Sequence, residues 1–188
     1  MTEILISLAI GIALSACSGF RVFVPLLVAN LATRFEFLHL SNGFEWLSSP
    51  TATYLLAAAT IAEIMAYYVP VVDNLLDTIA TPASFVAGTI LTTSFLKIDS
   101  PELQWTLGIL AGGGVAGTIQ AGTGLLRLAS TKFTGGFGNS FLATSENFVS
   151  IIFSLLTLWL PIFVAILGVL LFVFLLKKII KRFQTKKK

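Results

Sequence analysis

A carboxylate and a guanidinium interrupt otherwise apolar stretches of this sequence and are the first candidates for chemistry. Glu63 lies past the middle of one such stretch, where an unpaired charged side chain costs about 2.5–3.5 kcal/mol on insertion scales. It could bind a proton or a cation, with Tyr67 or Tyr68 as a hydrogen-bond partner, or form a structural ion pair with Arg21. The Arg21 guanidinium could hold a phosphate or carboxylate substrate through two parallel hydrogen bonds. It could equally satisfy Glu63 or free carbonyls at a helix break.

Asp73 and Asp77 form a second acidic group, four residues apart, so on a helix they share one face. A proline just before them predicts a helix start, where the helix dipole favours anions. Capping explains Asp73 well and Asp77 less well, because Asp77 lies a full turn further in. With Asn74, Thr78 and Thr81 the pair could hold a hard cation, although such an ion usually takes six or more oxygens.

Glu146 follows Thr144 and Ser145, either of which could cap a helix whose first turn holds the carboxylate. An internal repeat, described below, also makes Glu146 the counterpart of Glu63 and Gln120 the counterpart of Arg21. The repeat therefore predicts one polar core for substrate or ion binding, formed by Arg21, Glu63, Asp73, Asp77, Gln120 and Glu146.

Enzyme chemistry finds little support in the residue pattern. His39 is the only histidine and Cys17 the only cysteine, so paired-histidine metal motifs, cysteine metal clusters and intrachain disulfides are excluded. The glycine-rich stretch 108–124 lacks the Lys-Ser/Thr ending of a phosphate-binding loop. We therefore expect no catalytic residues, no metal and no cofactor.

The elements that position these residues must be membrane helices. Of the 188 residues, 56% are hydrophobic and 11% charged, against about 45–50% and about 25% in soluble domains. So few charges could not cover a water-soluble globule, and disordered chains are polar and highly charged. The composition predicts an all-α, polytopic transmembrane protein.

About 20 apolar residues cross a bilayer core as a helix, and the apolar stretches are divided on that basis. The first stretch is too long for one untilted span and is interrupted near Arg21 and at Pro25, so it is expected to be bent or broken. Residues 34–50 mix aromatic and polar side chains, as at a membrane interface, and residues 131–139 form a flexible connection. The six expected spans cover about residues 4–32, 51–69, 72–96, 103–128, 141–160 and 162–176.

The two halves of the chain resemble each other. Residues 30–35 and 127–133 are similar basic-aromatic segments, and each half then has two apolar helices split by a proline, Pro70 or Pro161. With three spans per half, the halves would lie in opposite orientations. This predicts an inverted repeat of residues 1–98 and 99–176, an arrangement common in secondary transporters whose sites lie between broken helices.

A basic tail, residues 177–188, contains seven of the twelve Lys and Arg residues. Such a tail usually stays in the cytoplasm and can contact anionic lipid, and six spans would bring the amino terminus to the cytoplasm too. Lys132 then falls inside, as does Arg127, while Arg34 and Lys97 lie outside. Nucleic-acid binding is not expected, because no aromatic or glycine-rich pattern accompanies the basic run.

The segment from Glu63 to Pro82 and the opening segment from Ser15 to Arg21 resemble the domain-of-unknown-function 4126 family of bacterial membrane proteins. The resemblance covers nearly the whole chain and is weaker over residues 139–146. Many members have an Asp-Lys pair where this chain has Tyr67 and Tyr68, which argues against a charge relay at that turn. The family has no established activity, so the resemblance implies the fold and leaves the function open.

The sequence thus predicts a bacterial inner-membrane, multi-pass protein of about six spans with both termini cytoplasmic. A small secondary transporter or permease is the favoured function, working as a homodimer because 188 residues enclose little pathway alone. Arg21 would contact an anionic group, and Glu63 and Glu146 would handle a proton or cation. The alternative is a non-transporting scaffold or assembly factor whose charges only lock helices together. A lipid-processing enzyme, the third possibility, has no visible catalytic set.

Overall fold

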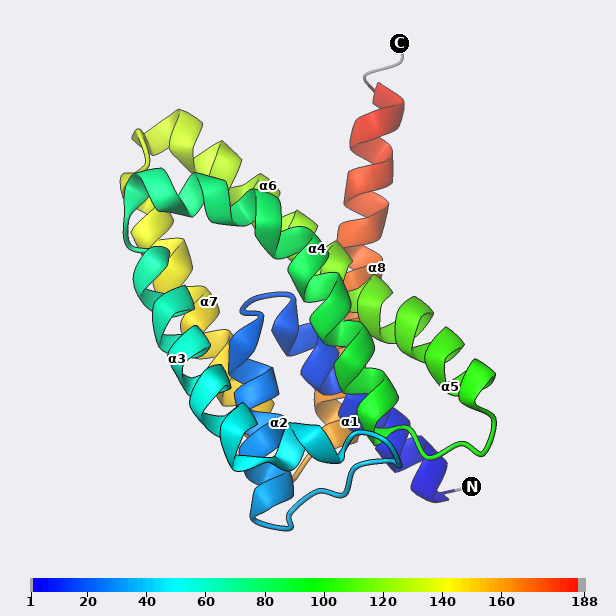
Figure 1. The fold of residues 1–188 in the computed structure, drawn as a ribbon. Coiled ribbons are helices and arrows are strands. Elements are labelled where there is room, and N and C mark those ends of the chain that lie inside the picture. Colours follow the sequence, from blue (N-terminus) through cyan, green and yellow to red (C-terminus); the bar gives the residue numbers. More distant parts are fainter. Residues whose placement is uncertain (1, 186–188) are drawn as a thin grey trace.

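The computed structural model describes residues 2–185, without the side chains of Pro70, Val71, Asp73, Asn74 and residues 182–185. These residues form helices and connecting loops (Figure 1), which confirms the predicted all-α class. The elements are α1 (Thr2–Ser18), α2 (Phe23–Arg34), the 3₁₀ helix η1 (Glu45–Ser48), α3 (Pro50–Ala66), α4 (Pro70–Phe95), α5 (Pro101–Leu107), the π-helical segment η2 (Gly108–Gly113), α6 (Gly114–Thr134), α7 (Phe137–Leu156) and α8 (Pro161–Thr185).

Three stretches of helix are long and apolar enough to cross a membrane: Leu75–Phe95, Pro101–Thr134 and Pro161–Lys181. The helices Thr2–Ser18, Phe23–Arg34 and Pro50–Ala66 are apolar but shorter. These apolar helices fit an integral membrane protein, as the composition predicts.

Prolines open several of the helices, as the sequence suggests for α4 and α8. A proline at the first helical position loses nothing, because that N–H has no partner within the helix. Upstream serines cap two such starts: the Ser49 hydroxyl accepts a hydrogen bond from the Ala52 N–H at 3.1 Å, and the Ser100 hydroxyl accepts one from the Leu103 N–H at 3.3 Å. Asp73 does not lie at the cap of α4, whose N-cap residue is Val69, and its side chain lies outside the described residues.

The first apolar stretch is not a bent span but a hairpin of two short helices. The chain leaves α1 after Ser18 and enters α2 at Phe23, and both helices run from this break toward the same end of the molecule (Figure 1). Glu3 and the Phe37–His39 segment accordingly line one hollow. The amino-terminal end of α1 and the carboxyl-terminal end of α8 lie at opposite ends of the molecule (Figure 1).

The flexible connection predicted for residues 131–139 is longer than the turn in the structure. α6 continues to Thr134 and α7 begins at Phe137. The turn is made by Gly135 and Gly136, whose φ angles of 64° and 97° lie in the left-handed region that glycine tolerates. Glu146 consequently lies in the middle of α7, not in a first turn capped by Thr144 or Ser145.

The internal repeat stays a prediction. Pro70 opens α4 and Pro161 opens α8, the last helix of each half, as expected. The first element differs, because α1 and α2 reverse direction whereas α5, η2 and α6 continue as one helix with a π-helical segment.

Glycines bring α4 and the η2–α6 helix into close contact, as the glycine-rich run predicts. A Cβ atom at Gly88 would lie 2.6 Å from both the Ala116 Cβ and the Gly112 carbonyl oxygen, whereas one at Gly114 would meet nothing within 4 Å. We expect Gly88→Ala to lower the free energy of unfolding by about 1–3 kcal/mol through overpacking.

Gly114→Ala is the matched control for this change. It is expected to be neutral or to stabilise the helix by up to about 1 kcal/mol, because alanine is the better helix former. Equilibrium unfolding of the detergent-purified variants measures both effects. Equal stability of the two variants would show that the helices do not approach at Gly88.

Candidate functional site

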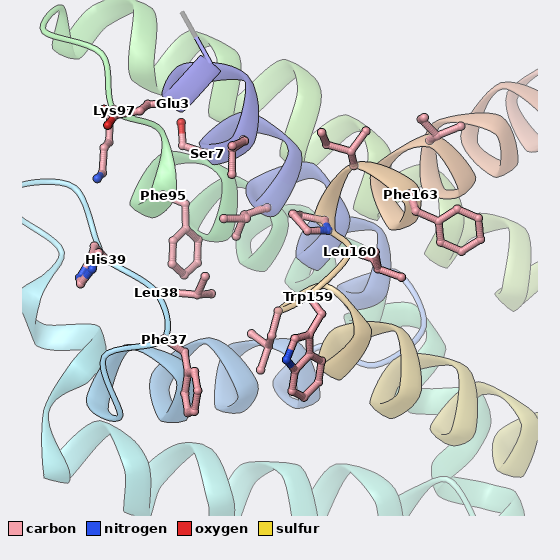
Figure 2. Close-up of a pocket in the computed structure, with 16 residues that line it drawn as sticks. Glu3, Ser7, Phe37, Leu38, His39, Phe95, Lys97, Trp159, Leu160 and Phe163 are labelled. Atoms are coloured by element: carbon pink, nitrogen blue, oxygen red, sulfur yellow. The ribbon is translucent and has the colours of Figure 1, made fainter.

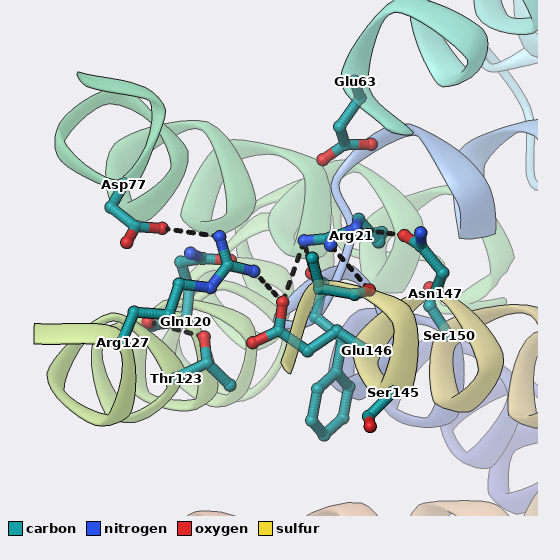
Figure 3. Close-up of polar contacts among 12 residues, drawn as sticks. Arg21, Glu63, Asp77, Gln120, Thr123, Arg127, Ser145, Glu146, Asn147 and Ser150 are labelled. Carbon is teal, nitrogen blue, oxygen red and sulfur yellow. Dashed lines mark hydrogen bonds and ion pairs between the residues drawn. The ribbon is translucent and has the colours of Figure 1, made fainter. Parts of the chain in front are cut away.

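Buried charged and polar side chains gather around the break between α1 and α2 (Figure 3). Arg21 is 0% exposed and Arg127 1%, while Glu146 and Glu63 are 7% and 8% exposed. The side chains come from the break itself and from α3, α4, α6 and α7. Such burial requires that each charge find a partner, because an uncompensated ion in an apolar interior costs several kcal/mol.

Glu63 holds the start of α2. One carboxylate oxygen accepts a hydrogen bond from the Val22 N–H at 2.7 Å, and the other accepts one from the Phe23 N–H at 3.0 Å. These N–H groups have no partner within α2, and the amino-terminal end of a helix favours negative charge. Glu63 on α3 thus caps a helix whose own N-cap residue, Val22, makes no side-chain cap bond.

Arg21 reaches across the break to α7. Its Nε donates to Asn147 Oδ1 at 2.5 Å, its Nη1 to Glu146 Oε2 at 2.9 Å, and its Nη2 to the Ala143 carbonyl oxygen at 3.0 Å. Ala143, Glu146 and Asn147 are spaced i, i+3 and i+4, so they share one face of α7. The predicted structural pairing of Arg21 with Glu63 is therefore corrected: Glu146 is the salt-bridge partner of Arg21 in the described part of the chain, and Glu63 binds backbone N–H groups instead.

Arg127, in α6, is a second buried guanidinium in this cluster. Its Nη2 pairs with Glu146 Oε2, the same oxygen that Arg21 contacts, and its Nη1 lies 3.3 Å from Asp77 Oδ1. Figure 3 shows the resulting row of charges running from Asp77 through Arg127 and Glu146 to Arg21. One carboxylate oxygen thus serves two guanidinium groups.

An aromatic ring completes the arrangement. The Tyr67 ring lies under both guanidinium groups, with its centroid 3.9 Å from Arg21 Cζ and 4.0 Å from Arg127 Cζ. Desolvated cation–π contacts of this kind contribute up to about 2 kcal/mol each. The neighbouring Tyr68 hydroxyl lies 3.0 Å from Thr144 Oγ1 and accepts a hydrogen bond from Asn147 Nδ2 at 3.3 Å. Tyr67 therefore contacts the two arginines and Tyr68 contacts α7. The sequence had instead suggested either tyrosine as a hydrogen-bond partner of Glu63.

The predicted polar core is brought together in large part. Arg21, Asp77 and Glu146 belong to one chain of ion pairs, and Glu63 lies at the same helix break. Gln120 is buried on the face of α6 that carries Arg127. The side chain of Asp73 lies outside the described residues.

The predicted cation site is not assembled by the described side chains. Asp77 faces Arg127, and no group of three or more His, Cys, Asp or Glu residues that could hold a metal occurs in the described part of the chain. Among the described residues Asp77 is an anion partner of Arg127, and the Asp73 side chain that would complete the predicted cation site lies outside the described residues.

Arg127 was not among the residues that the sequence predicts for the polar core, and Tyr67 was predicted there only as a hydrogen-bond partner of Glu63. The sequence analysis placed Arg127 on the cytoplasmic side, but the guanidinium is buried in the cluster. The available signal was spacing: Gln120, Thr123 and Arg127 are separated by three and four residues, which puts them on one helical face. The expected span ended at about residue 128, whereas α6 runs to Thr134. Had the longer helix been expected, Arg127 would have been assigned to the same buried face as Gln120.

A separate hollow lies at the end of the molecule where α1 begins (Figure 2). Its volume is about 840 Å³, and Phe95, Trp159 and Phe163 are among its mainly apolar walls. His39 and Lys97 also line it. None of the described residues that line this hollow belongs to the buried cluster around Arg21.

Comparison with known proteins gives a family and no function. A family described as a domain of unknown function (DUF4126) matches residues 8–181, so the chain belongs to that family. No curated protein and no solved structure matches the chain.

Proposed function

We propose that this member of the DUF4126 family is a small membrane permease in which Glu63 is the protonatable group. The observation that carries the proposal is the pair of hydrogen bonds from the Val22 and Phe23 N–H groups to the Glu63 carboxylate, at a helix break inside an apolar chain. Broken helices whose ends face charged groups are the usual sites of substrates and coupling ions in secondary transporters.

The geometry supports coupling between protonation and the position of α2. An ionised carboxylate accepts both N–H groups strongly, whereas protonation removes the charge that the helix end favours. Beside the helix break, Arg21 and Arg127 are balanced by Glu146 and Asp77, so a neutral Glu63 would leave the start of α2 without its own anion. Protonation of Glu63 would therefore loosen the contact between α3 and the start of α2.

An anionic substrate has a natural place in this scheme. The two arginines share a single oxygen of Glu146, and guanidinium groups bind carboxylate and phosphate groups through paired hydrogen bonds. A small anion could compete with Glu146 for one of them. We propose Arg21 as the substrate contact, because it lies at the helix break itself.

A scaffold function is the second candidate, favoured by the same chain of ion pairs. Asp77, Arg127, Glu146 and Arg21 connect α4, α6, α7 and the α1–α2 break. In this interpretation, the charges only fix the relative positions of the helices, and no ligand replaces any of them.

A comparison of wild type with Glu63→Gln distinguishes the two functions. Detergent-purified protein is titrated with inorganic phosphate, acetate and sodium or potassium salts between about pH 5 and pH 8, and the unfolding temperature is recorded. Bound ligand stabilises by mass action, so a permease predicts a pH-dependent shift with one of these probes in wild type. Glu63→Gln should stay folded and lose the pH dependence of that shift.

Glu45→Gln is the matched control, since it removes an acidic group in η1, away from the buried cluster. It should respond to the probes as wild type does. If wild type shows no shift with any probe and Glu63→Gln is only less stable, the permease proposal is wrong and the scaffold interpretation holds.

A further inference from the structure

An apolar groove separates α6 from the outer half of α8. Its volume is about 750 Å³, within the range of about 300–1,000 Å³ typical of ligand sites. One wall comes from α6 and the other from α8. The lining includes Gly122, Leu126 and Ala129 on α6, and Phe174, Lys178 and Lys181 on α8.

The groove opens where the two helices separate. At Gly122 they are in contact, because a Cβ there would lie 2.8 Å from a methyl carbon of Leu175. Beyond that contact α6 leans toward α7 while α8 continues alone to the end of the molecule (Figure 1). Phe174 and Leu126 remain 61% and 49% exposed along this opening.

Charge is confined to one end of the groove. Lys178 and Lys181 both line it, near the outer end of α8. Phe174, Lys178 and Lys181 are spaced i, i+4 and i+7 and therefore share one face, and the Lys178 ammonium lies 5.9 Å from the Phe174 ring centroid. An apolar channel ending in two ammonium groups matches a molecule with a hydrocarbon chain and an anionic head.

We propose that this groove binds an anionic phospholipid, with one acyl chain between α6 and α8 and the phosphate at Lys178 and Lys181. Both helices include stretches long and apolar enough to cross a membrane, so the apolar part of the groove would face hydrocarbon and its lysine end the head groups. Basic pockets between membrane helices recognise anionic head groups in this way. The site is independent of the buried Arg21 cluster and of the proposed permease function.

The test compares lipid binding by matched variants of the full chain. Purified protein in neutral detergent is titrated with phosphatidylglycerol, phosphatidylcholine or inorganic phosphate, and binding is followed by native mass spectrometry and unfolding temperature. We expect wild type to prefer phosphatidylglycerol over phosphatidylcholine and to show little response to inorganic phosphate. The double variant Lys178→Gln/Lys181→Gln should lose about tenfold or more in phosphatidylglycerol affinity, since each lysine near the head group contributes about 1 kcal/mol.

Two further variants separate the groove from general surface attraction. Lys132→Gln/Lys177→Gln removes the same charge outside the groove and should keep wild-type affinity. Ala129→Phe keeps every charge, fills the apolar wall and should weaken binding of phosphatidylglycerol. Equal loss in both lysine pairs, unchanged binding by Ala129→Phe, or an equal response to inorganic phosphate would each overturn the proposal.

Discussion

Glu146→Gln is expected to lower the free energy of unfolding by about 3–5 kcal/mol, the cost of breaking a buried ion pair by removing one partner. The carboxylate is 7% exposed, and its Oε2 atom is paired with both Arg21 and Arg127. A neutral amide leaves two guanidinium groups close together on the Tyr67 ring with less opposing charge. Equilibrium unfolding of the purified protein in detergent measures the loss.

Ser145→Ala is the control, because the Ser145 hydroxyl donates to the Phe141 carbonyl oxygen within α7 and has no other hydrogen-bond partner among the described residues. It should change stability by less than about 0.5 kcal/mol, as surface substitutions usually do. A double-mutant cycle of Glu146→Gln with Arg127→Met then isolates the pair. We expect a coupling of at least about 1 kcal/mol, within the range for residues in contact. A loss below about 1 kcal/mol for Glu146→Gln would mean that the two arginines do not depend on this carboxylate.

The cycle also bears on function, because stability and ligand response need not fall together. Arg127→Met/Glu146→Gln removes one charge of each sign but also the ion pairs that these residues make with Asp77 and Arg21, so it should cost less stability than the sum of the two single changes. If the protein is a scaffold, this change in stability is the only effect that we expect. A permease needs the charges for its ligand as well, so the double variant should lack the ligand-dependent shift of wild type under conditions in which it is folded.

Much of the fold could be predicted, because the composition determines the class of helix and the positions of prolines mark helix starts. The low charge content requires membrane-type helices, and Pro70 and Pro161 mark where two of them begin. The close helix contact at Gly112 is possible because glycine has no Cβ atom. The site could be predicted in part for a similar reason: Arg21, Glu63 and Glu146 are rare charges in apolar segments, and such charges seek partners.

The rest could not be predicted, because it depends on direction and pairing. A break near Arg21 is visible in the sequence, but a bent helix and a reversed hairpin have the same composition. Arg127 lies near the end of an apolar run, where an arginine at the membrane surface and one turned inward look alike. The choice among partners for Glu63 was settled by the free N–H groups of α2, and that geometry appears only once the chain reverses.

The hairpin predicts that the two ends of the chain lie on opposite sides of the membrane. Since α1 and α2 return to the end where they began, the remaining path through α3, α4, α5–α6, α7 and α8 makes an odd number of passes (Figure 1). The positive-inside bias then places the basic tail in the cytoplasm and the amino terminus outside. In this prediction Arg34 and Lys97 lie outside, as the sequence suggests, whereas the number of passes becomes odd and the amino terminus lies outside.

Cysteine labelling tests this directly, because Cys17 is buried and is the only cysteine. In a Cys17→Ala background, single changes Glu3→Cys, His39→Cys, Thr134→Cys and Gln184→Cys are treated with a membrane-impermeant maleimide in sealed cells. Positions 3 and 39 should react, while 134 and 184 should react only after the membrane is opened. His39→Cys serves as the internal control, since both topologies place residue 39 outside. Protection of position 3 together with position 184 would restore the even number of spans, with both termini cytoplasmic, and would mean that α1 crosses the membrane with α2 instead of turning back.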